Sequence, residues 1–300
     1  MKITRRRYQS ADCQRISQFL VRHYQPDNLD GNWLRPAWDY MHSHPSLDET
    51  ALDRIGIWEF EGKIVAVVHY ESRLGEAFFE CHPEYRFLKK ELLQYAEENL
   101  YQLDKGEKKL RVYCNDFDLD FKSLLKAAGY NLLEQETRPL SRLTIPAEIP
   151  QPELPTGFQL ASLAEENDLT KINQVLWRGF NHPGEAPREE EEGRKKMQSS
   201  PHFRKDLTIV IADPEGQFRA YCGFWIVPEQ SYGMIEPLAV DSDFRRMGLA
   251  RACVWEGVRR CRELGAETIY VGSDLPFYLS LGFQVLYRSR PWVSNSTRMG

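Results

Sequence analysis

The sequence predicts an α+β protein of two similar domains in tandem, each with a mostly antiparallel, mixed and twisted sheet flanked by helices. Three observations predict this class. A proline-rich stretch divides the chain near residue 150, the second half alternates helical and strand patterns, and the first half repeats their order. The 300 residues suffice for two ordinary domains, and 42% hydrophobic with 28% charged residues is typical of a globular protein.

In the first half, one strand and two helices are expected before three consecutive strands. Their ranges are 5–9 for the strand, 11–24 and the surroundings of Trp38 for the helices, and 55–61, 63–71 and 75–82 for the three strands. Apolar residues then recur at helical spacing at Leu88, Leu92, Ala96 and Leu100. A strand at 109–114 and a helix followed by a turn at 121–131 are expected to complete this half.

The stretch TIPAEIPQPELPTG, residues 144–157, is the strongest linker signal in the chain. It contains four prolines, Pro146, Pro150, Pro152 and Pro155. Proline removes a backbone donor and favours extended polyproline geometry over helix or sheet. We therefore expect a linker over 146–156, between a first domain at 1–145 and a second at 157–300.

The second half follows the same order of elements. A strand is expected at 158–163, helices over 165–180 and from about 187, an antiparallel meander at 208–214, 218–228 and 234–240, and a strand at 267–273. Ala250, Val254, Val258 and Cys261 mark a helix before the last of these strands. A short helix through Tyr278 and a strand from Phe283 are expected to end this half.

The two halves also resemble each other in detail at their ends. FKSLLKAAGYN in the first half matches PFYLSLGFQ in the second, so that Gly129-Tyr130 falls where Gly282-Phe283 falls. The match is weak residue by residue but consistent in order. This pattern is typical of a duplicated domain.

Composition excludes several classes of protein. A formal net charge of −5 argues against broad nucleic-acid binding, because a surface that follows phosphates needs a basic excess. The six cysteines form no CxxC pair and have no histidine at ligand spacing, which favours neither disulfides nor zinc and indicates a reducing cytoplasm. No apolar stretch has the length of a signal-peptide core or a membrane span. We expect no metal, no nucleic-acid partner and no membrane partner.

The stretch VDSDFRRMGLARA, residues 240–252, predicts an anion site where a strand ends and a helix begins. A helix start offers unpaired backbone N–H groups and the positive end of the helix dipole, so it binds phosphate if the chain comes close. Gly248 and Ala250 permit that approach, and the arginines supply guanidinium groups for a pyrophosphate. The expected binding residues are Arg245, Arg246, Met247, Gly248, Leu249, Ala250 and Arg251. Alternatively, the arginines are solvated and the glycine only shapes the turn.

These residues resemble the signature of the GNAT superfamily of acyl-CoA-dependent N-acyltransferases. That signature is a strand ending in hydrophobic-x-Val, then Arg/Gln-x-x-Gly-x-Gly/Ala, and later Tyr-x-x-x-Gly-Phe. Here the three parts are Leu238-Ala239-Val240, Arg245 to Ala250, and Tyr278 to Phe283. The resemblance covers most of residues 157–290 and covers 1–145 only in outline, and it implies two tandem GNAT-like domains.

The resemblance implies acetyl-CoA as the co-substrate. The end of the strand at Leu238, Ala239 and Val240 is expected to splay from its neighbour and present backbone groups to the pantetheine arm and the thioester carbonyl. The loop at 245–251 is expected to hold the pyrophosphate. Many relatives have an asparagine shortly after the fifth strand, where this chain has Val271-Gly272-Ser273-Asp274, so that contact is in doubt; Ser273 is the donor that could replace it.

Two residues are candidates for the chemistry. Transfer to an amine needs a group that accepts the ammonium proton, and Glu236, on the strand that leads into the site, is our candidate general base. A solvent-facing or salt-bridged strand carboxylate is an equally weighted alternative. Tyr278 matches the tyrosine of the family motif, and its hydroxyl suits protonation of the departing thiolate. A core tyrosine with its hydroxyl at the rim is the alternative for that position.

The first half lacks these parts. Aligned with the second half, it has Lys89 opposite Gly248, Glu91 opposite Ala250, and Leu125 opposite Tyr278. Bulk, a carboxylate and an apolar side chain oppose binding and catalysis there. We therefore interpret residues 1–145 as a degenerate, non-catalytic GNAT-like domain. Mycothiol synthase-like tandem enzymes are similar in arrangement, but no motif assigns that substrate.

The resulting hypothesis is an N-acetyltransferase that moves an acetyl group from acetyl-CoA directly to a primary amine. The acceptor, a small molecule or a peptide, is not identified by the sequence. The alternative is a non-catalytic acyl-CoA sensor or protein-interaction module that keeps the nucleotide cradle. Retention of both Glu236 and Tyr278 favours the enzyme.

Overall fold

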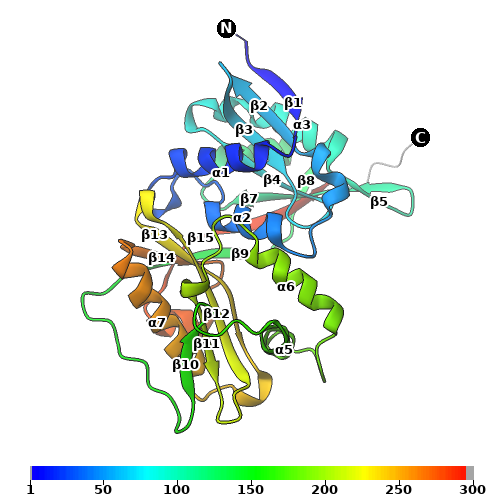
Figure 1. Cartoon of the computed structure of the whole chain (residues 1–300). Coiled ribbons are helices and arrows are strands. Elements are labelled where there is room, and N and C mark those ends of the chain that lie inside the picture. The colour runs from blue at the N-terminus through cyan, green and yellow to red at the C-terminus, as the bar shows by residue number, and fades with distance from the viewer. Residues whose placement is uncertain (1, 295–300) are drawn as a thin grey trace. The chain divides into compact units, whose positions relative to one another are not determined.

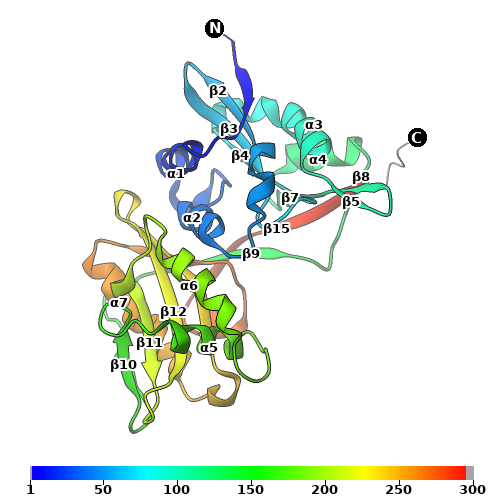
Figure 2. The same cartoon turned by 45° about the vertical axis from the view of Figure 1, so that its right-hand side comes forward.

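The computed structural model describes residues 2–294, which form two compact units. Unit 1 contains residues 2–42, 46–140 and 285–294, and unit 2 contains residues 43–45 and 141–284. Figures 1 and 2 show the elements of each unit from two directions. Each unit contains a series of paired strands with helices packed on it, in agreement with the α+β class that the sequence predicts.

Unit 1 has a mixed sheet in the order β1-β2-β3-β4-β7-β15-β8. Only β4 and β7 pair in parallel, and the other neighbours are antiparallel. The strands are β1 (Thr4–Arg7), β2 (Gly56–Phe60), β3 (Lys63–His69), β4 (Glu76–Cys81), β7 (Arg111–Asn115), β8 (Tyr130–Leu132) and β15 (Gln284–Ser294), with a separate hairpin of β5 (Gln102–Asp104) and β6 (Glu107–Lys109). The helices are α1 (Asp12–His23), α2 (Arg35–Ser43), α3 (Lys89–Asn99) and α4 (Leu119–Ala127).

Unit 2 has a second mixed sheet in the order β9-β14-β13-β12-β11-β10. Here β13 and β14 are the parallel pair. The strands are β9 (Arg138–Thr144), β10 (Gln159–Ser162), β11 (Thr208–Ala212), β12 (Phe218–Val227), β13 (Tyr232–Val240) and β14 (Thr268–Val271). The helices are α5 (Leu169–Gly179), α6 (Glu191–Gln198), α7 (Leu249–Glu263) and α8 (Pro276–Ser280).

The last strand of each half of the chain joins the sheet of the other half. The sequence places the strand that begins near residue 284 at the end of the second half, yet β15 pairs with β7 and β8 of unit 1. Residues 141–144 of β9 pair with β14 of unit 2. Residues 145–158, which connect β9 to β10, contain neither helix nor strand. An alternating sequence pattern predicts a strand but not the strand with which it pairs. The backbone N–H and C=O groups of a strand can form the same hydrogen bonds with any unpaired sheet edge.

Unit 2 buries one apolar cluster on each face of its sheet. On one face, Cys222 and Phe224 of β12 pack with α7. On the other face, Tyr221 packs with residues of α5. Figure 1 shows α7 and α5 on opposite sides of these strands. The alternation of side chains along β12 therefore fixes which helix covers which face.

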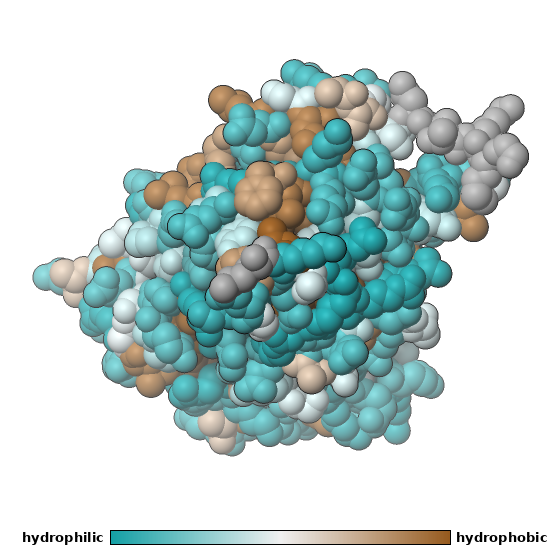
Figure 3. Space-filling view, turned by 90° about the horizontal axis from the view of Figure 1, so that it is seen from above, coloured by the Kyte–Doolittle hydropathy of each residue, from teal (hydrophilic) through white to brown (hydrophobic). Residues whose placement is uncertain are grey.

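Three further features of the molecule are the polarity of its surface, the state of its cysteines and the character of its helices. The face in Figure 3 is mainly hydrophilic, with apolar side chains gathered in small groups. All six cysteines are free thiols, and five of them are buried. In the part of the chain that the structure describes, no helix combines the length and the apolar character that crossing a membrane requires.

Candidate functional site

The candidate site of unit 2 begins where two parallel strands stop pairing. The register between β13 and β14 runs from Tyr232 opposite Thr268 to Ile235 opposite Val271, where β14 ends. β13 continues to Val240, paired with β12 on its other side. Five residues of β13, numbers 236–240, therefore extend past the end of β14, and within residues 2–294 no strand pairs with them on that edge.

Backbone groups of Leu238 and Val240 face this open edge. The N–H of Asp241 donates to the carbonyl of Arg219 on β12, at 2.9 Å. Alternate residues of an antiparallel strand direct their backbone groups to opposite edges. Ala239 therefore faces β12, whereas Leu238 and Val240 face away from it. The strand end that the sequence singles out thus directs backbone groups to the side that β14 does not cover.

Helix α7 begins immediately after a glycine with left-handed backbone geometry. Gly248 has φ of 85° and precedes Leu249, the first residue of the helix. Apart from the adjacent residues, the nearest atom to a Cβ added at Gly248 would be the carbonyl oxygen of Glu153, at 3.9 Å. The first N–H groups of the helix have no intrahelical acceptor. The helix start therefore has the open approach and the unpaired donors that an anion needs.

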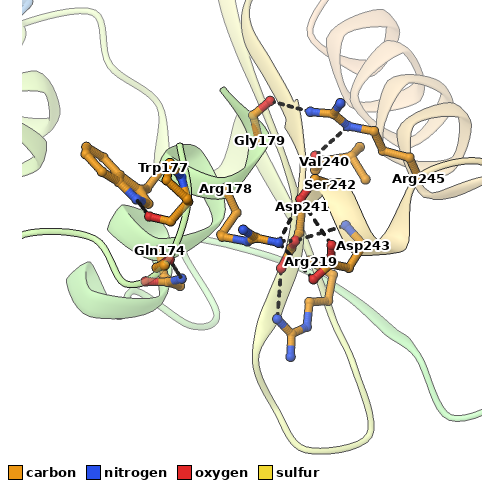
Figure 4. Close-up of polar contacts among 12 residues, drawn as sticks. Gln174, Trp177, Arg178, Gly179, Arg219, Val240, Asp241, Ser242, Asp243 and Arg245 are labelled. Carbon is orange, nitrogen blue, oxygen red and sulfur yellow. Dashed lines mark hydrogen bonds and ion pairs between the residues drawn. The ribbon is translucent and has the colours of Figure 1, made fainter. Parts of the chain in front are cut away.

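The three arginines of this segment have different surroundings. Arg246 and Arg251 are exposed, and within residues 2–294 neither has an ion-pair partner. Arg245 is also exposed, but its guanidinium donates to the carbonyl of Val240 at 3.3 Å and to that of Gly179 at 2.8 Å. Arg245 thus links the end of β13 to the end of α5 (Figure 4), while Arg246 and Arg251 remain as unneutralised cations.

A buried carboxylate that the sequence analysis missed organises the turn between β13 and α7. Asp241, 3% exposed, accepts hydrogen bonds from Arg219 at 2.9 Å and Arg178 at 3.3 Å. Arg178 also bonds Ser242 and Asp243, each at 2.8 Å (Figure 4). Asp241 is 22 residues from Arg219 and 63 residues from Arg178 in the sequence, so no local sequence pattern predicts these contacts.

Asp241→Asn is expected to lower the free energy of unfolding by about 2 to 3 kcal/mol, because it removes a buried charge that accepts two charge-assisted hydrogen bonds. Urea denaturation followed by circular dichroism measures this loss. The matched control is Asp243→Asn, which removes a carboxylate that is 72% exposed and bonds the same Arg178. We expect less than about 1 kcal/mol for the control. Equal losses in the two variants would contradict the importance of the buried carboxylate.

The structure brings Glu236 and Tyr278 into one electrostatic environment. Burial raises the pKa of the Tyr278 phenol above its usual range, and the charges of Cys222 and Glu236 raise it further. The ring of Tyr278 packs against Phe277 and Phe283, with centroids 5.1 and 5.6 Å away. Its hydroxyl hydrogen-bonds to none of residues 2–294. The phenol is therefore neutral at ordinary pH, and its O–H has no acceptor among the described residues.

Glu236 lies on an irregular part of β13. Gly223 of β12 stands opposite two residues, Glu236 and Pro237, between the regular pairs on either side. Such a bulge re-aims the side chains of the longer strand. The side chain of Glu236 is partly exposed.

Ser273, the possible replacement for the family asparagine, has a local role at the start of α8. Its hydroxyl accepts from the N–H of Leu275 at 3.3 Å, and its carbonyl accepts from Ser141 at 2.7 Å.

In the described residues 2–294, no group of three or more His, Cys, Asp or Glu side chains lies close enough to hold a metal ion.

Residues 169–283 match the model of the acetyltransferase (GNAT) family. In curated proteins, the chain is 35% identical over 83 residues to the uncharacterized N-acetyltransferase YhbS of Escherichia coli K12, covering 26% of this chain and 50% of that protein. It is 28% identical over 141 residues to the mycothiol acetyltransferase of Propionibacterium freudenreichii subsp. shermanii, covering 45% of each. The chain thus spans about half the length of the curated relatives it matches.

Two solved structures resemble the whole chain in fold. A GCN5-related N-acetyltransferase from Sphaerobacter thermophilus has a TM-score of 0.67 at 17% identity, covering 99% of this chain and 96% of that one. A tandem GNAT protein from the clavulanic acid biosynthesis pathway has a TM-score of 0.66 at 13% identity, with 98% of each chain covered. At such identities the likeness concerns the fold alone, and it confirms the fold class that the sequence predicts.

Proposed function

We propose that the chain is a member of the acetyltransferase (GNAT) family, whose model matches residues 169–283, and that it transfers an acetyl group from acetyl-CoA to a primary amine. The transfer is direct, from the thioester to the amine of a small molecule or a peptide. The observation that carries the proposal is the open edge of β13 beside the glycine-led start of α7. Six free cysteine thiols support a reducing compartment, and we propose the cytoplasm.

The donor is held by three kinds of group in this proposal. The diphosphate lies on the first N–H groups of α7, where Gly248 leaves space and Arg246 and Arg251 supply positive charge. The pantetheine arm runs along this edge of β13 and bonds the backbone of Leu238 and the N–H of Val240, since the carbonyl of Val240 accepts from Arg245. Arg245 acts through its two carbonyl contacts, which hold the strand end against α5. Met247, Leu249 and Ala250 contribute backbone to this cradle.

The thioester supplies an activated acetyl group, and the chain's residues handle the protons. A lysine-like amine has a pKa of about 10.4, so deprotonating it at pH 7 costs roughly 4 to 5 kcal/mol. Glu236 accepts this proton, directly or through water. The amine nitrogen bonds to the carbonyl carbon, the carbon–sulfur bond breaks, and Tyr278 protonates the thiolate. The nitrogen loses its second proton as it becomes an amide, and this proton restores the phenol of Tyr278. The raised pKa of Tyr278 keeps the phenol protonated, so its O–H is present when the thiolate departs.

Unit 1 has an equivalent strand end, and its backbone contacts support a non-catalytic role. In each unit, the residue after the strand donates its N–H to the adjacent antiparallel strand, at 2.9 Å; it is His82 in unit 1 and Asp241 in unit 2. The preceding residue, Cys81 or Val240, therefore directs its backbone to the opposite edge. Cys81 thus corresponds to Val240.

Residues of the same unit occupy this edge in unit 1. The side-chain amide of Asn32 accepts from the N–H of Cys81 at 2.7 Å and donates to its carbonyl at 3.3 Å. Asn115, at the end of β7, donates to the carbonyl of Gly31 at 2.8 Å. These bonds use the backbone groups that an amide of a pantetheine arm would need. Binding there would have to displace the segment at 31–32.

The unit 1 residues that align with the functional motifs of unit 2 also form contacts or are buried within unit 1. Lys89 forms an ion pair with Asp118, and Glu91 accepts from the indole of Trp58 at 2.8 Å. Leu125 is fully buried. We therefore propose that residues 1–145 bind no acetyl-CoA and that the chain binds one molecule of it.

A thiol-release assay with acetyl-CoA tests the function. Acceptors from four classes, namely polyamines, amino acids, aminoglycosides and peptides, are compared with a reaction that lacks acceptor. Acceptor-dependent release of CoA, with an acetylated amine identified by mass spectrometry, is expected for one class. Tight binding of acetyl-CoA without turnover on any acceptor would favour the non-catalytic sensor instead.

A further inference from the structure

The bulge of β13 depends on a specific residue of the neighbouring strand. The regular pairs are Cys222 with Leu238 and Phe224 with Ile235, which leaves Gly223 opposite Glu236 and Pro237. A Cβ atom at residue 223 would lie 2.6 Å from the carbonyl oxygen of Glu236, closer than real contacts allow. The extra residue of β13 therefore packs directly on the backbone of Gly223.

A buried indole holds the carbonyl of the bulge. The Nε1–H of Trp225 donates to the carbonyl of Glu236 at 2.9 Å, and Trp225 is 3% exposed. Its ring meets Phe203 edge to face, with centroids 5.7 Å apart. A bulge disrupts the ladder and displaces its carbonyl from the usual backbone donors, so a side-chain donor at this point sets the orientation of the peptide.

We propose that Trp225 is a positioning residue for acetyl transfer: its indole N–H fixes the Glu236 peptide in the bulge, and this sets the direction in which the Glu236 carboxylate leaves the strand. The inference rests on the proposed function of Glu236 as the base. Trp225 touches neither substrate nor reacting atoms in this role. It acts through the Cα position and direction of Glu236.

Trp225→Phe tests the proposal, since phenylalanine keeps an aromatic ring beside Phe203 and removes only the donor and part of the ring volume. We expect kcat to fall by about 10-fold to 100-fold, the loss typical of a misplaced catalytic group. The dissociation constant of acetyl-CoA stays within about 2-fold, because the cradle at the start of α7 is not changed. Unchanged kcat in this variant would overturn the positioning role.

The matched control is Trp255→Phe. Trp255 is a buried tryptophan of α7, and its indole N–H has no hydrogen-bond partner within residues 2–294. The same substitution there removes similar volume but no hydrogen bond, so kcat is expected to change by less than about 2-fold. Equal losses at the two positions would assign the effect to packing and would overturn the role of the Trp225 donor.

A double-mutant cycle separates the inference from the proposed function. If Trp225 acts through Glu236, Trp225→Phe causes no further loss of kcat in a Glu236→Gln background. A full additional loss there overturns the inference. Full turnover by Glu236→Gln alone would show that Glu236 is not the base, which contradicts the proposed function. Unchanged kcat in Trp225→Phe, by contrast, contradicts only the positioning role of Trp225.

Hydrogen exchange of the Trp225 indole provides a readout that needs no acceptor. The indole proton, assigned by its disappearance from the NMR spectrum of Trp225→Phe, is expected to exchange slowly in the native chain. Gly223→Ala, which displaces the Glu236 carbonyl, is expected to accelerate this exchange at least about 10-fold. Exchange as fast as that of an exposed indole in the native chain would overturn the inference.

Discussion

Gly248→Glu is expected to raise the dissociation constant of CoA by at least about 100-fold while the chain stays folded. The added carboxylate stands at the start of α7, where we propose that the diphosphate binds. Two unit charges about 4 Å apart near a protein surface interact by about 4 kcal/mol, which exceeds a factor of 100 in affinity. A Cβ at residue 248 meets no clash, since the nearest atom outside the adjacent residues is 3.9 Å away. Isothermal titration calorimetry measures the change.

Gly248→Ala is the matched control. Both substitutions impose the cost of φ near +85° on a residue with a Cβ, about 1 to 2 kcal/mol, but alanine adds no charge. The alanine variant should retain most of the affinity, and the wild-type chain should bind one CoA. If the wild-type chain binds two CoA molecules and the glutamate variant binds one with full affinity, the chain has a second site. If both chains bind one CoA with the same affinity, the proposed position of the diphosphate is wrong.

Tyr278→Phe is expected to lower kcat by at least about 100-fold, the usual contribution of a positioned general acid. Affinity for acetyl-CoA should not change, because the phenol contributes to departure of the thiolate. Steady-state kinetics at saturating acceptor measure kcat, and calorimetry measures affinity. The control is Tyr221→Phe, which removes another buried phenol hydroxyl from the cluster beneath α5 and should retain turnover.

The raised pKa of Tyr278 also predicts a pH dependence. A phenol donates only while protonated, so a pKa held above its usual value keeps the acid functional through neutral and moderately alkaline solution. Raising the pH to about 10, the ordinary pKa of tyrosine, should therefore leave the acid function of the wild-type chain intact. Loss of kcat with a midpoint near pH 8, absent from Tyr278→Phe, would contradict this assignment.

Local sequence patterns determined the fold class and located the candidate site. Helical and strand periodicities depend on neighbours within a few residues, so the meander that becomes β11, β12 and β13 could be read directly. The same holds for the turn before α7, where Gly248 has the left-handed geometry that glycine favours. The motif at 245–250 and the match of residues 169–283 to the acetyltransferase (GNAT) family concern the same segment.

Only the tertiary structure decided the contacts between distant segments. It assigned β15 to unit 1, joined Arg178 to Asp241 across 63 residues, and placed the Trp225 indole on the Glu236 carbonyl. Such contacts depend on strand register, on which sheet edge is open and on the packing of side chains, none of which has a periodic signature. The sequence by itself thus determined where the candidate site begins, and packing decided which distant residues hold it in shape.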